Sequence, residues 1–113
     1  MNIQIFGTNK SFDTKKAVRF FKERNIKVQF IDMKEKGLSR GELESVVRAA
    51  GGLEALLDEN CRDQDALALI KYISDRDKME KLLENQQVLK LPIVRNGRQA
   101  TAGCHPEIWK TWE

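Results

Sequence analysis

The residues of this chain that could carry redox or acid–base chemistry are few. The two cysteines, Cys61 and Cys104, stand far apart and fit no metal-binding or redox spacing. We expect both to be free thiols, Cys61 at the surface or half-buried, and a disulfide would need Cα atoms within roughly 7 Å. His105 follows Cys104 directly, and because neighbouring loop residues rarely face each other, we expect a structural role for it.

Ser11 stands where a strand pattern gives way to a helical one. The first N–H groups of a helix have no partner inside it, and the helix dipole favours negative charge at that end. A thiol in this position would be acidified and could attack an oxyanion or a disulfide. A serine hydroxyl can cap the helix or donate a hydrogen bond, but it cannot carry out the redox step.

Length and composition indicate one globular domain over residues 1–113, with 41% apolar and 33% charged residues. The net charge of +3 arises from 20 basic and 17 acidic residues along the whole chain, so we expect no nucleic-acid binding. The N-terminus lacks a signal-peptide pattern, and no apolar run is long enough to span a membrane. We therefore expect a cytoplasmic protein. We also expect it to be a monomer. No phosphate loop, metal constellation or Ser/His/Asp set is evident.

Alternating apolar residues predict strands over 3–7 and 26–31, separated by a helix over about 12–25. Such a βαβ unit places its two strands in parallel. Ser39 and Glu42 form a capping box that opens a helix ending at 51–52. Further helical pieces are expected over 53–57, over 66–73 and from a cap at Ser74 to about residue 85, so that a helical insert covers about 39–86.

The last third predicts a strand over 88–95 that is entered through a proline. Asn96 and Gly97 favour a type I′ hairpin turn, followed by a return strand over 98–101. Pro106 begins a short final helix, in which Trp109 and Trp112 are expected to be packing anchors. The order is βαβ, helical insert, ββα.

Several segments together resemble the arsenate-reductase (ArsC/Spx-like) family. They are GTNKSFDTKKA (7–17), FIDMKEKGLS (30–39), GLEALLD (52–58), LPIV (91–94) and the glycines at 97 and 103. The resemblance covers nearly the whole chain. It implies an α/β thioredoxin-like fold with a mixed four-stranded sheet. An ungapped match through Gly7 and residues 15–17 places Ser11 at the reactive cysteine, and Pro92 falls on the family's cis proline. A natural serine and an introduced replacement of cysteine would give the same sequence here.

The resemblance also implies a site around that position. Ser11 takes the catalytic place, and the substrate-binding positions are Lys10, Phe12, Asp13, Thr14, Lys90 and Pro92. Thr14 occupies the second cysteine position of relatives with a CxxC pair. The family's arginines are thinly represented. Leu91 stands before Pro92, the nearest residues after the helix begun at Gly52 are Asn60, Cys61 and Arg62, and the end of the hairpin offers residues 103–105. Lys10, Lys90, Arg95 and Arg98 could restore some positive charge, although we favour solvated positions for them.

The family implies a thiol-dependent oxidoreductase, an arsenate reductase or a glutaredoxin-like enzyme. It would hold no bound cofactor and would use glutathione or thioredoxin as its external reductant. Because of Ser11, we do not expect efficient reduction of an oxyanion by the present chain. The alternative is a non-enzymatic, Spx-like regulator that binds RNA polymerase or another protein partner through the charged helix of residues 15–24 and the inserted helices.

Overall fold

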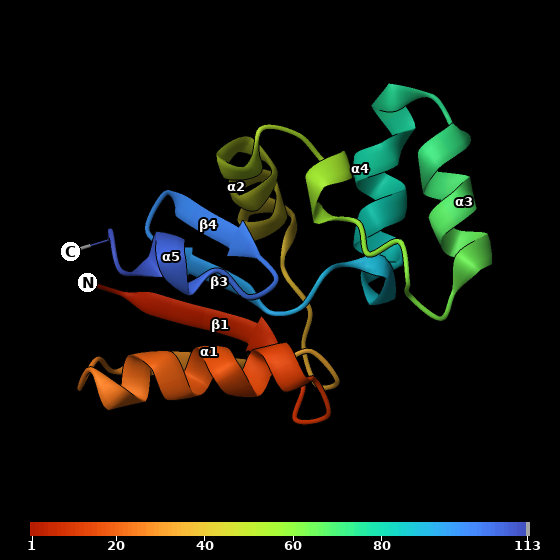
Figure 1. Ribbon diagram of the computed structural model, residues 1–113. Coiled ribbons are helices and arrows are strands. Elements are labelled where there is room, and N and C mark those ends of the chain that lie inside the picture. Colours follow the sequence, from red (N-terminus) through yellow and green to blue (C-terminus); the bar gives the residue numbers. More distant parts are fainter. Residues whose placement is uncertain (113) are drawn as a thin grey trace.

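The computed structural model describes residues 1–112, which form a mixed four-stranded sheet with helices on both faces (Figure 1). The strand order is β2-β1-β3-β4. Strand β1 (Ile3–Gly7) runs parallel to β2 (Val28–Asp32) and antiparallel to β3 (Ile93–Asn96), which pairs with β4 (Gln99–Ala102). The predicted α/β class and the parallel βαβ unit are confirmed.

One apolar cluster lies between the sheet and the helices α1 (Phe12–Glu23) and α5 (Pro106–Trp109). Its buried members are Ile3, Ile5, Ala17, Phe21, Val94, Trp109 and Trp112. Ile3 and Ile5 point to the same face because side chains alternate along a strand. The indole N–H of Trp109 donates to the Thr101 hydroxyl at 2.8 Å. Both tryptophans are packing anchors, as the sequence predicts.

A second cluster contains the inserted helices α2 (Arg40–Ala50), α3 (Gln64–Tyr72) and α4 (Asp75–Glu84), with two short 3-10 turns, η1 (Glu54–Leu56) and η2 (Gln86–Val88). The capping box at the start of α2 is present, and Gly51 ends that helix with φ 80°. Figure 1 shows α3 and α4 side by side at the end of the molecule away from β1. No helix among residues 1–112 is long and apolar enough to cross a membrane.

The hairpin turn differs from the prediction. Asn96 pairs with Gln99, so the two central residues of the turn are Gly97 and Arg98 rather than Asn96 and Gly97. Of these two residues only Gly97 has a positive φ, 60°, and this matches a type II′ turn and not type I′. The cross-strand register therefore decides which residues form the turn.

Other element boundaries also shift. Residues 88–91 are not part of β3, because η2 occupies 86–88 and the Lys90 N–H donates to the Leu56 carbonyl at 2.8 Å. The predicted helix over 53–57 is a single 3-10 turn. Ser74 precedes α4 but makes no cap to its backbone, because its hydroxyl donates to the Asp77 carboxylate at 2.8 Å.

Candidate functional site

Ser11 caps α1. Its backbone is extended, with φ −80° and ψ 122°, and its Oγ accepts from the Thr14 N–H at 3.1 Å. The Ser11 N–H in turn donates to the Thr8 carbonyl at 3.1 Å, which closes the loop between β1 and α1. The side chain is half-buried. An atom at the position of Oγ therefore stands at the positive end of a three-turn helix and within reach of a helix N–H.

Thr14, whose N–H donates to the Ser11 Oγ, has a buried side chain and is 2% exposed. Its Oγ1 is buried and has no hydrogen-bond partner. The side chain packs against Gly7, where an added Cβ would lie 2.4 Å from Oγ1. Gly7 thus allows α1 to approach the end of β1 closely.

Pro92 lies at the same end of the sheet. Phe6 pairs with Ile93 in the antiparallel register, so Gly7 and Pro92 come next on the two adjacent strands. The Leu91–Pro92 peptide bond is cis, and the Pro92 carbonyl accepts from the Gly103 N–H at 2.9 Å. The fold therefore brings the loop of Ser11 and the segment of Pro92 to the same end of the sheet.

The remaining predicted substrate-binding residues do not form one cluster with Ser11 and Pro92. Lys10 is exposed, Asp13 is half-buried, and Phe12 is 78% exposed in the first turn of α1. Lys90 lines a different hollow, together with Thr101, His105 and Ile108 but with no residue of the loop 8–14.

Arg95 does not serve the loop either. It stands opposite Gln4, away from the Pro92 end of β3, and donates to the Gln4 side chain at 2.8 Å. The Glu42 carboxylate is 3.7 Å from the same guanidinium nitrogen. The interpretation of Arg95 as a solvated residue is wrong, because the side chain is largely buried and paired. Arg98 is exposed in the hairpin turn.

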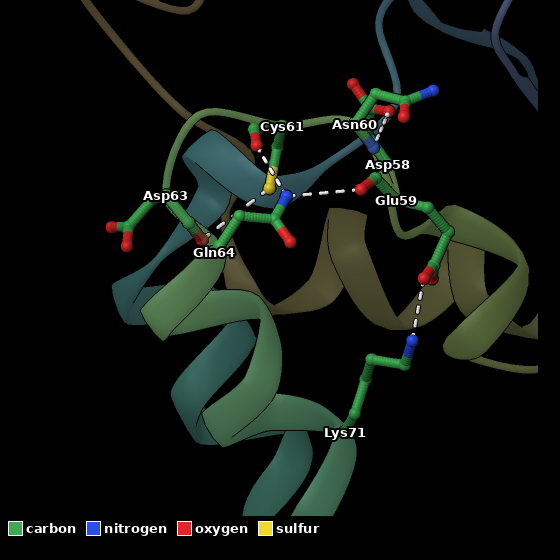
Figure 2. Close-up of polar contacts among 7 residues, drawn as sticks. All are labelled: Asp58, Glu59, Asn60, Cys61, Asp63, Gln64 and Lys71. Carbon is green, nitrogen blue, oxygen red and sulfur yellow. Dashed lines mark hydrogen bonds and ion pairs between the residues drawn. The ribbon is translucent and has the colours of Figure 1, made fainter.

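Neither cysteine of the chain is activated. Cys61 is buried rather than half-buried or at the surface, and its Sγ contacts the Asp63 carbonyl at 3.6 Å (Figure 2). Burial raises the pKa of the Cys61 thiol above its usual value, and burial does the same to the pKa of the half-buried Cys104 thiol. Both thiols are free. They are therefore neutral and weakly nucleophilic at neutral pH.

The loop around Cys61 satisfies its own polar groups. Figure 2 shows the Gln64 amide donating to the Cys61 carbonyl at 2.7 Å and to the Glu59 carbonyl at 3.1 Å. The Asn60 N–H donates to the Asp58 carboxylate at 2.9 Å, and Lys71 pairs with Glu59 at 2.6 Å. This arrangement holds the start of α3, where the Asp63 side chain accepts from the Ala66 N–H. We interpret it as structural.

His105 has the local role that the sequence predicts. Its Nε2 is 2.8 Å from the Ala102 carbonyl oxygen and its Nδ1 is 3.4 Å from the Glu107 carboxylate. No group of three or more metal-ligating side chains occurs within the described part of the chain.

Sequence reasoning did not identify a groove between α1 and the edge strand β2. The groove starts at the loop of Ser11 and contains one exposed aromatic side chain, Phe30. The signal in the sequence is the repeat of Lys15, Arg19 and Lys22 at four- and three-residue intervals, which lies on one side of a helix. The groove is lined by Thr8, Asn9, Thr14, Lys15, Val18, Arg19, Lys22 and Phe30.

The sheet order, the two-sided helix packing and the inserted helices define a thioredoxin-like α/β protein of the ArsC type of architecture. A protein from Bacteroides fragilis described as ArsC family related has 18% identity and a TM-score of 0.85, over 100% of this chain and 98% of that one.

An arsenate reductase from Vibrio cholerae shares 22% identity, with a TM-score of 0.80 over 96% of this chain and 94% of its own. An arsenate-reductase-related protein from Brucella melitensis shares 19%, with a TM-score of 0.66 over 99% and 94%. These similarities establish the fold. No family model matches the sequence, and no curated protein matches it.

Proposed function

We propose that this chain is an ArsC-family protein whose architecture serves thiol-dependent reduction, and in which Ser11 stands in the place of the reacting cysteine. The observation that carries the proposal is the position of the Ser11 Oγ, 3.1 Å from the Thr14 N–H at the start of α1 and at the sheet end that also holds Pro92. The similarity of fold to an arsenate reductase supports the same assignment.

A cysteine at residue 11 would supply the missing chemistry. Its thiolate, stabilised by the α1 N-terminus, would attack the arsenic of arsenate and displace hydroxide, which leaves as water after protonation. A thiol such as glutathione would then attack the cysteine sulfur. Arsenite would leave with two electrons, and a mixed disulfide would remain. A second thiol would release the cysteine and form the oxidised disulfide of the reductant. A serine oxygen cannot form the disulfide on which this sequence depends.

The test is NADPH-coupled turnover of the chain and of Ser11→Cys, with arsenate or a mixed disulfide as substrate and glutathione/glutaredoxin or thioredoxin as reductant. Ser74→Cys is a matched control, because Ser74 also precedes a helix but has no counterpart of Pro92. Turnover in Ser11→Cys alone supports the proposal. A folded Ser11→Cys protein that has no turnover and an ordinary thiol pKa contradicts it.

A second candidate is a non-enzymatic regulator that binds a protein partner, as in the Spx-like branch that contacts RNA polymerase. The specific observation in its favour is Phe12, which is 78% exposed beside the capped N-terminus of α1. Large exposed aromatic side chains are common anchors of protein interfaces. Purified RNA polymerase would be titrated with the chain and with Phe12→Ala. Binding that Phe12→Ala weakens supports this candidate, and the absence of binding rejects this partner.

A further inference from the structure

The outer edge of β2 offers unused backbone hydrogen-bonding groups. The Met33 N–H donates to the Gly7 carbonyl at 2.9 Å, and backbone direction alternates along a strand, so residues 29, 31 and 33 face β1. Val28 and Phe30 therefore point their N–H and C=O groups away from the sheet. Since β2 is an edge strand, no other part of residues 1–112 reaches these groups. Such an edge can accept another extended chain.

Beside this edge runs the groove between α1 and β2. Val18 and Val28 are partly buried against the cluster beneath, while Phe30 remains 38% exposed. A second hollow continues the first past Val18 and Lys22 towards Ile26 and Lys27. The groove thus has an apolar floor alongside an open strand edge.

The sides of the groove are positively charged. Lys15, Arg19, Lys22 and Lys27 line it, and the lining contains no acidic residue. None of these four cations forms an ion pair within the described residues. Residues 10–27 carry seven basic and two acidic side chains, a net charge of +5, whereas the rest of the chain carries 13 basic and 15 acidic ones, a net of −2. Although charged residues of both signs occur along the whole chain, the net positive charge is therefore concentrated on this segment.

We propose that the α1–β2 groove binds an extended acidic segment of a partner protein, which adds as a fifth strand beside β2. Backbone groups of the segment pair with those of Val28 and Phe30. An apolar side chain of the segment packs on Phe30, and its carboxylates face Lys15, Arg19 and Lys22.

Two other ligands of this groove, a second copy of this chain and a nucleic acid, fit it less well. Two copies of this chain joined symmetrically at β2 would bring two like-charged α1 helices together, which is unfavourable. A nucleic acid would satisfy the cations and could stack on Phe30, but it has no repeating peptide N–H and C=O groups to match the strand edge.

The proposal does not rest on thiol chemistry, so the Ser11→Cys turnover assay and the assay below can fail independently.

The probe is a fluorescein-labelled peptide that alternates Glu with Val or Phe, titrated with the whole chain at low salt and followed by anisotropy. We expect saturable binding that weakens as salt is added. A peptide with Lys in place of Glu, and one with N-methylated backbone amides on alternate residues, should bind at least about tenfold more weakly. Amide hydrogen exchange should slow at Val28 and Phe30 when the acidic peptide is bound.

Two pairs of variants locate the binding. Lys22→Glu should weaken it about tenfold, whereas Lys16→Glu makes the same charge change on α1 outside the groove and should have little effect. Phe30→Ala should also weaken it about tenfold, and Tyr72→Ala removes a still more exposed aromatic on α3 as its control.

Three outcomes would overturn the proposal. The first is no saturable binding of the acidic peptide, or equal losses in Lys16→Glu and Lys22→Glu. The second is tight binding of single-stranded DNA that Lys22→Glu abolishes, with no such binding of the peptide, which would assign the groove to nucleic acid. The third is concentration-dependent self-association that protects the Val28 and Phe30 amides without peptide, which would assign it to a second copy.

Discussion

Thr14 on α1 packs against the Cα of Gly7 at the end of β1. A Cβ at residue 7 would lie 2.4 Å from the Thr14 Oγ1 and 2.5 Å from its Cγ2. This contact sets the distance between α1 and the sheet at the point where Ser11 is positioned. The absence of a side chain at residue 7 is therefore part of what holds the candidate site together.

Gly7→Ala should destabilise the protein by about 1–3 kcal/mol, because the new methyl group meets a buried side chain that has little room to move. Thr14→Ala should partly restore stability in the double variant, since it removes both atoms in closest contact. Urea unfolding measures both effects. Gly41→Ala is the control, because nothing lies within 4 Å of an added Cβ at that position of α2, and no loss is expected there. Equal losses at residues 7 and 41 would contradict this account.

Ser11→Ala should lower the free energy of unfolding by about 1 kcal/mol, since it removes the hydrogen bond that caps α1. Ser74→Ala should cost less, because the Ser74 side chain makes no cap to the backbone of α4. Both serines precede helices of similar length, so the comparison isolates the cap. A loss at Ser74 as large as that at Ser11 would show that the Ser11 hydroxyl does not stabilise α1.

The thiols should react in two groups. The pKa of Cys61 and that of Cys104 are both raised above the usual 9.0 by burial, so their alkylation by iodoacetamide should be slow at neutral pH and should accelerate above about pH 9. In Ser11→Cys, a third thiol should react fast at neutral pH, since the α1 N-terminus favours its thiolate. Mass spectrometry of modified peptides across a pH series assigns each rate. If the profile of this introduced thiol overlays those of Cys61 and Cys104, the position is not an activated one.

Thr101→Val should lower the free energy of unfolding by about 1–3 kcal/mol. The variant keeps the shape of the side chain but removes the acceptor of the buried Trp109 N–H, which is then left unpaired. Trp109→Phe removes that donor. In the Trp109→Phe protein, adding Thr101→Val should therefore lower the free energy of unfolding by a distinctly smaller amount. Thermal or urea unfolding of the four proteins completes the double-mutant cycle. Additive losses would mean that this hydrogen bond contributes nothing.

Hydrophobic spacing predicted most of the fold because it reports directly on burial. Ile3 and Ile5 alternate, Ala17 and Phe21 recur at helical spacing, and each pair proves to share one face of the first core. The same spacing does not report on register. The hairpin turn therefore moved by one residue, to Gly97 and Arg98, because the pairing of Asn96 with Gln99 decides its centre.

The candidate site was predictable only where backbone geometry decides it. The family resemblance placed Ser11 at the start of α1, where a serine can cap the helix, and the structure shows that cap. The positions of Lys90 and Arg95 did not follow, because a charge in a sequence carries no information about the direction of its side chain. Arg95 lies beside Gln4 and Glu42 only because β3 pairs with β1 in that register.

The sheet separates the two apolar clusters, and α3 and α4 belong to only one of them. Together with their place at the far end of the molecule, this makes the α3–α4 pair a unit that can open while β1, α1 and α5 stay closed. Amides in α3 and α4 should therefore exchange through a sub-global opening of lower free energy than the one that exposes β1. The protein would then lose the order of its inserted helices before it loses the strand-and-helix frame that holds residue 11.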